Sequence, residues 1–247
     1  MVSTKKDYDL KTIILAGGLG TRLSEETISR PKPMVEVGGI PIVQQILEIY
    51  LSQGFSEFIL ALGYKKEMLE AWAKDFAQHS SCKIMSLDTG IDTQTGGRVK
   101  KAIQSQEDQA FFVTYGDGLA NIDLDRLLRF HLSHGKIATV SAVRPPARFG
   151  HLQIQGDSVV HFGEKNQADE GWINGGFFVF NREIEQFIHA NEEALENGAL
   201  PRLAKIGELM AFHHEGFWKP MDALRDKIEL DELAKLTPAP WLTKISN

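Results

Sequence analysis

The chain has 247 residues, 43% of them hydrophobic and 24% charged, with a formal net charge of −6 at pH 7. This composition suits one large α/β domain and excludes an intrinsically disordered chain. The acidic balance argues against a nucleic-acid partner, so we expect a small anionic ligand. The single cysteine, Cys82, excludes a disulfide framework and a cysteine-based zinc site, and we expect it to be a buried or partly buried thiol.

No apolar run approaches the roughly 20 residues of a membrane span. The polar start of the chain, Ser3-Thr4-Lys5-Lys6-Asp7, lacks the apolar region of a signal peptide. We therefore expect a cytoplasmic protein with no membrane partner.

The first half of the chain alternates between two kinds of pattern. Short apolar runs and longer amphipathic runs predict, in order, strand 12–16, helix 41–51, strand 57–62, helix 65–78, a weaker strand 83–87, helix 97–104 and strand 110–114. This alternation predicts a mostly parallel sheet covered by helices on both faces. Ligands of such sheets bind beyond the carboxyl ends of the strands.

The pattern changes after about residue 135. The later elements predicted are strand 136–143, a hairpin of 151–154 and 159–162 turning at Gly156-Asp157, strand 172–180, and helices 182–190 and 222–233. We find no internal repeat or linker. The simplest interpretation is one α/β domain over residues 1–247, with a mixed, mostly parallel central sheet and a small antiparallel hairpin region.

A glycine-rich run leaves the first predicted strand. It is Leu15-Ala16-Gly17-Gly18-Leu19-Gly20-Thr21-Arg22, and Pro31-Lys32-Pro33-Met34 follows it. Three glycines in four positions let backbone N–H groups approach an anion without obstruction by Cβ atoms, and Arg22 and Lys32 add positive charge. The run lacks the ending of a P-loop and the third glycine of a dinucleotide fingerprint. It predicts a phosphate cradle of another kind, although one glycine alone could be only a turn former.

Two isolated carboxylates stand out beside this cradle. Asp117 lies between two glycines in Tyr115-Gly116-Asp117-Gly118, directly after a predicted strand, which exposes its carboxylate and suits a hydrated magnesium ion. A simple turn is the alternative. Asp222 follows Pro220-Met221 at the expected start of the last helix, where a helix N-cap is the alternative. We expect both carboxylates to bind Mg²⁺.

Two carboxylates, a glycine loop and two cations together predict a site for nucleotidyl transfer. A nucleoside triphosphate brings concentrated negative charge, which magnesium, Arg22 and Lys32 would neutralise while an acceptor phosphate attacks the α-phosphorus in line. Pyrophosphate would leave. Because the nucleophile is already an anion near neutral pH, the lack of an obvious catalytic His or Cys does not count against an enzyme.

A third set of residues suits the acceptor. Lys165, in Phe162-Gly163-Glu164-Lys165, can pair with the acceptor's phosphate, while Glu164 and the Asn174 amide suit sugar hydroxyls. Asn174 and Gly175 belong to the run Trp172-Ile173-Asn174-Gly175-Gly176-Phe177-Phe178. For Lys165 alone, a solvated hairpin lysine is the alternative.

Taken together, these runs resemble one family. With Gly63-Tyr64-Lys65, Thr95-Gly96-Gly97-Arg98 and His214-Glu215-Gly216-Phe217-Trp218, they are similar to the glucose-1-phosphate cytidylyltransferases among the sugar-1-phosphate nucleotidyltransferases. The similarity runs from Leu10 to Trp241. It implies a Rossmann-like nucleotidyltransferase fold, a nucleotide-binding half at about 10–135, a sugar-phosphate-binding half at about 136–241, and a homo-oligomer.

The resemblance also implies a reaction and a role for each residue. CTP and α-D-glucose 1-phosphate would give CDP-glucose and pyrophosphate, with Mg²⁺ on Asp117 and Asp222. The acceptor would meet Glu164, Lys165, Asn174 and Gly175, and the catalytic set would be Arg22, Lys32, Asp117 and Lys165. The nucleotide would be held by Leu15, Ala16, Gly17, Gly18, Leu19, Gly20, Thr21, Arg22, Lys32, Gly63, Thr93, Arg98 and Gly116.

This chain departs from the family's pattern at two places. Asn166 stands where the family usually has proline, and the stretch between Phe76 and Asp88 is shorter. A cytidylyltransferase for another sugar phosphate or a phosphorylated alcohol therefore stays open. A non-catalytic nucleotide-binding regulatory protein is the alternative from another class, but a sensor needs affinity and not the full charge set of Arg22, Lys32, Asp117, Lys165 and Asp222.

Other conspicuous side chains favour structural roles. His131 and His134 lie three apart on a predicted helix, and His213 precedes His214, but no third metal ligand stands at a suitable spacing. Trp72 and Phe76 share one helical face, which is typical of a core stripe.

Overall fold

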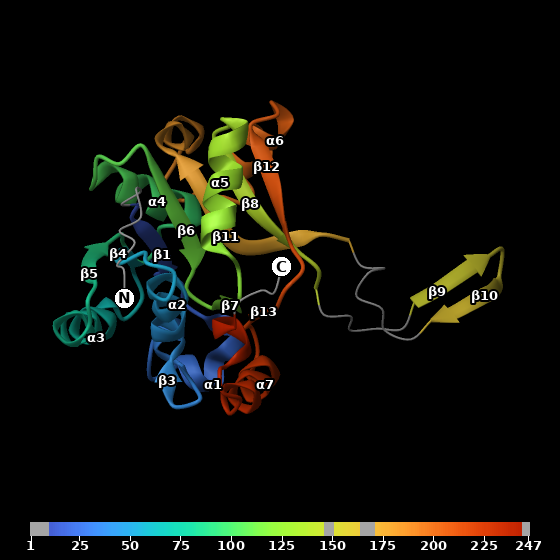
Figure 1. The fold of residues 1–247 in the computed structure, drawn as a ribbon, viewed down its shortest axis with the longest axis horizontal. Helices are drawn as coiled ribbons and strands as arrows, with labels where there is room; N and C mark the ends of the chain where they lie inside the picture. Colours follow the sequence, from blue (N-terminus) through green and yellow to red (C-terminus); the bar gives the residue numbers. More distant parts are fainter. Residues whose placement is uncertain (1–9, 146–150, 164–170, 244–247) are drawn as a thin grey trace, which may run out of the picture.

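The computed structural model describes residues 10–145, 151–163 and 171–243 and centres on a seven-stranded sheet (Figure 1). The order of strands across the sheet is β12 (Leu209–His214), β8 (Ala138–Val143), β11 (Ile173–Asn181), β6 (Ala110–Tyr115), β1 (Thr12–Ala16), β4 (Glu57–Leu62) and β5 (Lys83–Asp88). β11 runs antiparallel to β6 and β8, and every other pair in the sheet is parallel. The predicted mixed, mostly parallel sheet is confirmed.

Helices cover both faces because the side chains of each strand alternate between two apolar cores. In β1, Ile14 and Ala16 face one core, and Ile13 and Leu15 face the other. The first core is covered by α2 (Ile42–Leu51), α3 (Lys66–His79), α5 (Leu124–His134) and α7 (Leu224–Ala234). The second is covered by α4 (Thr95–Gln104) and α6 (Ala199–Lys205). All five residues of β1 are buried, as expected for a central parallel strand.

Short elements complete the described chain. Three two-stranded sheets are formed by β2 (Glu36–Val37) with β3 (Ile40–Pro41), β7 (Gly118–Ala120) with β13 (Trp218–Pro220), and β9 (His151–Gln155) with β10 (Ser158–Gly163). The remaining helical segments are η1 (Thr21–Leu23), α1 (Ser24–Thr27), η2 (Lys32–Met34), η4 (Arg182–Phe187) and η5 (Pro240–Leu242). The antiparallel hairpin predicted around Gly156 is confirmed as β9 and β10.

In the second half one predicted helix is wrong, and strand β12 and helix α6 are among the elements that were not predicted. The helix predicted over 182–190 is the 3₁₀ segment η4, whose first residue is tied to the loop before β6 by hydrogen bonds from Arg182 N to Gln109 O (2.8 Å) and from Arg182 Nη1 to Gln106 O (2.8 Å). Strand β12 was not predicted. It is an edge strand with only one fully buried side chain, that of His214, so its apolar signal is weak.

Several single side chains lie as the sequence predicts. Cys82 is free and buried. The rings of Trp72 and Phe76 stack with centroids 5.1 Å apart and pack against the first core. None of the helices in the described residues is both long and apolar enough to cross a membrane.

A buried histidine fastens α5 to the sheet. The ring of His131 makes hydrogen bonds with Thr139 Oγ1 on β8 (2.9 Å) and with Asn181 Oδ1 on β11 (3.1 Å), and His134 Nε2 meets the same threonine oxygen at 2.8 Å. Both histidines are therefore structural, as the missing third ligand suggests. Burial is the main cause that lowers the pKa of His131 and of His134 below 6.5.

This arrangement predicts a pH dependence of stability. Because the folded protein keeps His131 neutral, its contribution is fully present above pH 6.5 and is lost as the pH falls from 6.5 toward the lower folded pKa. The urea midpoint should fall over this range, and His131→Gln should reduce the slope of midpoint against pH. His79→Gln, at the exposed end of α3, is the matched control and should keep the wild-type slope. An unchanged slope in His131→Gln would contradict the assignment.

Candidate active site

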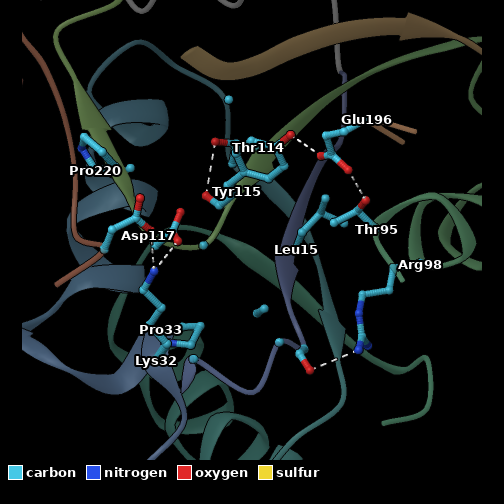
Figure 2. Close-up of a pocket in the computed structure, with 18 of the residues that line it drawn as sticks. Leu15, Lys32, Pro33, Thr95, Arg98, Thr114, Tyr115, Asp117, Glu196 and Pro220 are labelled. Atoms are coloured by element: carbon cyan, nitrogen blue, oxygen red, sulfur yellow. Dashed lines mark hydrogen bonds and ion pairs between the residues drawn. The ribbon is translucent and has the colours of Figure 1, made fainter. Parts of the chain in front are cut away.

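A cavity of about 760 Å³ lies beyond the carboxyl ends of β1 and β6 (Figure 2). It gathers most of the site residues predicted from the sequence: Leu15, Ala16, Gly17, Gly18, Leu19, Gly20, Thr21, Arg22, Lys32, Thr93, Arg98, Gly116, Asp117, Asn174, Gly175 and Asp222. Gly63 lies outside the lining. Glu164 and Lys165 fall outside the residues that the structure describes.

Lys32 joins the two candidate metal ligands. Its Nζ lies 2.6 Å from Asp117 Oδ2 and 3.2 Å from Asp222 Oδ1, and its side chain is only 13% exposed. Burial alone would lower the pKa of Lys32, but the charges and hydrogen bonds of the two aspartates outweigh it and raise the pKa above 10.5. Arg22 Nη1 lies 3.7 Å from Asp222 Oδ2 on the exposed rim of the cavity.

The β7–β13 ladder brings the two aspartates together. Gly118 pairs with Pro220, and Met221 N donates to Asp117 O at 2.8 Å, so Asp117, directly before β7, lies beside the residues that follow β13. Asp222 is not the helix N-cap. Helix α7 starts at Leu224, and the Asp226 carboxylate accepts from the backbone N–H groups of residues 222 and 223 at 3.2 and 3.0 Å. The Asp222 carboxylate is therefore directed to Lys32.

The carboxylates of Asp117 and Asp222 fit a divalent cation that would take its other ligands from a bound phosphate and from water. Two carboxylate oxygens converge on one positive charge, and carboxylates are the ligands that Mg²⁺ prefers. No cluster of three or more His, Cys, Asp or Glu side chains could hold a metal ion among the described residues. A magnesium ion here would take two protein ligands and complete its shell with phosphate oxygens and water, which is its usual arrangement in nucleotide sites.

The glycine loop, residues 17–20, rests on a buried arginine. Arg98 Nη2 donates to Gly17 O at 3.0 Å, and Arg98 Nη1 donates to Leu62 O at 2.8 Å, at the end of β4. A Cβ atom on Gly17 would lie 2.1 Å from Arg98 Nη1, and one on Gly63 would lie 2.7 Å from it. A side chain at position 17 would displace the Arg98 guanidinium from these hydrogen bonds, and one at position 63 would also meet the backbone oxygen of Gly17 at 2.7 Å. Arg98 supports the loop from behind, and Gly63 leaves room for that support.

Several residues that line the cavity received no role from sequence reasoning, and four of them have side chains of interest. They are Thr95, Tyr115, Glu196 and Trp218. Thr95, Tyr115 and Trp218 stand inside motifs that carried the family resemblance, and this was the signal that could have found them. Glu196 has no such signal, because it reaches the cavity through contacts between α4 and the chain after β11, such as Gly96 N to Glu193 O at 3.0 Å.

Comparisons with known proteins agree on one family. The family model described as Nucleotidyl transferase matches residues 11–220. The glucose-1-phosphate cytidylyltransferase of Salmonella typhi is 44% identical, over 95% of this chain and 99% of its own. The probable glucose-1-phosphate cytidylyltransferase of Bacillus subtilis (strain 168) is 37% identical, over 94% of this chain and 99% of its own.

Solved structures show the same architecture. That of HddC from Yersinia pseudotuberculosis complexed with GMP-PN has a TM-score of 0.71 at 26% identity, covering 92% of this chain and 100% of that chain. The sequence match, the fold and the charged cavity thus point in one direction. This chain belongs to the nucleotidyl transferase family and, within it, to the glucose-1-phosphate cytidylyltransferases.

Proposed function

We propose that this chain joins CTP and α-D-glucose 1-phosphate to give CDP-glucose and pyrophosphate. One observation carries the proposal: Lys32, Asp117 and Asp222 converge beside a glycine loop in a chain that is 44% identical to a glucose-1-phosphate cytidylyltransferase. The nucleotide occupies the half at about 10–135, and the sugar phosphate the half at about 136–241. A homo-oligomer in the cytoplasm and Mg²⁺ as the metal belong to the same proposal.

In this proposal the triphosphate lies on the glycine loop. Backbone N–H groups of residues 17–20 and the cations of Arg22 and Lys32 neutralise its charge, and they do so more strongly as charge builds on the leaving pyrophosphate. Asp117 and Asp222 would hold magnesium, which would supply Lewis-acid stabilisation at the α-phosphoryl group. Leu15, Ala16, Thr21, Thr93, Arg98 and Gly116 complete the nucleotide pocket.

The acceptor half holds the nucleophile in line. Lys165 pairs with the acceptor's phosphate, and Glu164, Asn174 and Gly175 meet the sugar. Since the attacking phosphate oxygen is already anionic, the protein positions it and has no proton to remove. Orientation of two bound reactants can itself contribute about 7–11 kcal/mol toward the barrier.

The nucleotide and acceptor preferences test the proposal directly. Pyrophosphate release should be fastest with CTP and glucose 1-phosphate in a panel of nucleoside triphosphates against sugar phosphates and phosphorylated alcohols. Equal kcat/KM for CTP and UTP would overturn the nucleotide assignment. Faster turnover with another acceptor would select the alternative cytidylyltransferase, and no pyrophosphate with any pair would leave the regulatory alternative.

Removing either carboxylate tests the metal assignment. Asp117→Asn and Asp222→Asn should each lower kcat by at least about 100-fold, because each loses a ligand to the ion that stabilises the transition state. Asp75→Asn, an exposed carboxylate on α3, is the matched control and should keep wild-type activity. Binding of CTP should also lose its dependence on magnesium in calorimetry. Full activity in excess chelator would contradict the assignment.

Two lysine variants separate the two phosphate sites. Lys32→Ala should weaken CTP binding first, because Lys32 lies beside the glycine loop. Lys165→Ala should reduce kcat/KM for glucose 1-phosphate by a factor corresponding to roughly 2–4 kcal/mol, while CTP affinity changes little. Calorimetry with CTP and steady-state kinetics with both variants give the comparison. Loss of CTP binding in Lys165→Ala with unchanged acceptor kinetics would show that this division is wrong.

A further inference from the structure

Glu196 is the least explained charged residue of the cavity. It comes from the segment between η4 and α6, lines the cavity and is exposed there. In the described part of the chain it makes no ion pair with a lysine or arginine, unlike Glu193 nearby, whose carboxylate is paired with Arg202 at 2.6 Å. An unneutralised carboxylate in the wall of a cavity built for anions calls for a ligand group of its own.

The Glu196 carboxylate is the centre of a continuous hydrogen-bond chain. The Tyr115 hydroxyl donates to Glu196 Oε1, and Thr95 Oγ1 donates to Glu196 Oε2 at 2.8 Å. Asn174 Nδ2 in turn donates to the Tyr115 hydroxyl at 2.9 Å. Figure 2 shows Glu196 and Thr95 on the opposite side of the view from Lys32 and Asp117, with Tyr115 between them. These hydrogen bonds thus connect α4, the end of β6 and the start of β11 along one wall of the cavity.

The hydrogen-bond inventory decides what this wall can bind. A carboxylate offers about four lone-pair positions, and two on Glu196 are used. The Tyr115 hydroxyl donates its one hydrogen bond to Glu196 and accepts one from Asn174, which leaves it one further acceptor position. A phenol is protonated near neutral pH, which keeps this hydrogen-bond direction. What Tyr115 and Glu196 still offer is acceptor capacity.

From this geometry we propose that Tyr115 and Glu196 form a specificity element for the acceptor, an accepting pair that selects a sugar hydroxyl of the hexose 1-phosphate. Phosphate oxygens are excluded as partners, because they are anionic acceptors and belong with Lys32, Arg22 and the glycine loop. The pair is hydrogen-bonded to Asn174, on the acceptor side of the proposed site, which favours a sugar hydroxyl over the amino group of cytosine. The inference rests on the proposed function.

The surroundings hold the pair in place before substrate arrives. The Tyr115 ring packs edge to face on Phe178 with centroids 5.6 Å apart. Gly176 has a φ of +79°, and a Cβ atom there would lie 2.5 Å from the Tyr115 ring, so glycine leaves the space that the ring needs. The segment that carries Glu196 is tied to α4 by Gln94 N to Asn191 O at 2.9 Å and by Leu195 N to Thr95 Oγ1 at 2.9 Å. Such support is typical of recognition groups.

The test combines enzyme variants with substrate analogues. Steady-state kcat/KM is measured for glucose 1-phosphate and for its 2-, 3-, 4- and 6-deoxy analogues with wild type, Tyr115→Phe and Glu196→Gln. For one of the deoxy analogues, the kcat/KM of the wild type should be about 10- to 100-fold lower than for glucose 1-phosphate, the usual range for the loss of a hydrogen bond to a charged group. Glu196→Gln should lose about as much on glucose 1-phosphate itself, and the additional penalty for that one analogue should largely disappear.

A matched control and a conservative variant keep the outcome interpretable. Glu192→Gln removes an exposed carboxylate from the same segment but outside the cavity lining, and it should keep every wild-type penalty. Tyr115→Phe keeps the ring and removes only the hydroxyl, and it should reduce the same analogue penalty as Glu196→Gln. If one of the two variants folds poorly, the other still tests the inference. The dissociation constant of CTP should stay within about twofold in both variants.

Three results would overturn the inference, and they can be told apart. If the losses of kcat/KM for all the deoxy analogues are unchanged in both variants, Tyr115 and Glu196 have only a structural role. A shift in CTP-over-UTP preference with unchanged sugar penalties would place the pair at the base. If wild type forms no nucleotide sugar from any hexose 1-phosphate, the proposed function itself fails, and this inference fails with it.

Discussion

One ammonium group holds the active site in its geometry. Lys32 contacts carboxylates that lie 85 and 190 positions away in the chain, and without this cation two negative charges would face each other in a half-buried cavity. The two carboxylates are 27% and 39% exposed, so removing Lys32 would cost less than breaking a fully buried ion pair, but it would leave both charges uncompensated. The arrangement of two aspartates around one lysine still has an excess negative charge. In the proposed function, this excess charge would help to hold the magnesium ion that accompanies the nucleotide.

The sheet places the two halves of the site because one strand runs the other way. β11 is antiparallel to β6, with Phe177 opposite Thr114, so the start of β11 lies beside the carboxyl end of β6. Asn174 and Tyr115 consequently meet, so the start of β11 adjoins the loop that carries Asp117. If β11 ran parallel to β6, Asn174 would lie at the other end of the strands, away from the glycine loop. The mixed topology is thus a condition for one cavity that is lined by both Asn174 and the glycine loop.

The sequence predicted those parts that depend on local pattern. β1, β4 and β6 are long apolar runs, and the cradle around Gly17 needs residue types that few other loops combine. The remainder depends on contacts between distant segments. Arg98 was expected at the nucleotide, but only the fold reveals that its guanidinium is bonded to the carbonyls of Gly17 and Leu62. Edge strand β12 and the position of Glu196 have no periodic signal, because partners elsewhere in the chain determine them.

The two cations of the cradle differ in the free state, and this difference matters for catalysis. Lys32 is enclosed and already engaged by carboxylates, whereas the Arg22 side chain is 80% exposed and its contact with Asp222, at 3.7 Å, is a surface ion pair that contributes little in water. In the proposed function, Arg22 would therefore give up little when a phosphate replaces Asp222 as its partner. It would accelerate the chemical step to the extent that it binds the phosphates more strongly in the transition state than in the bound substrate, because only such a difference lowers the barrier.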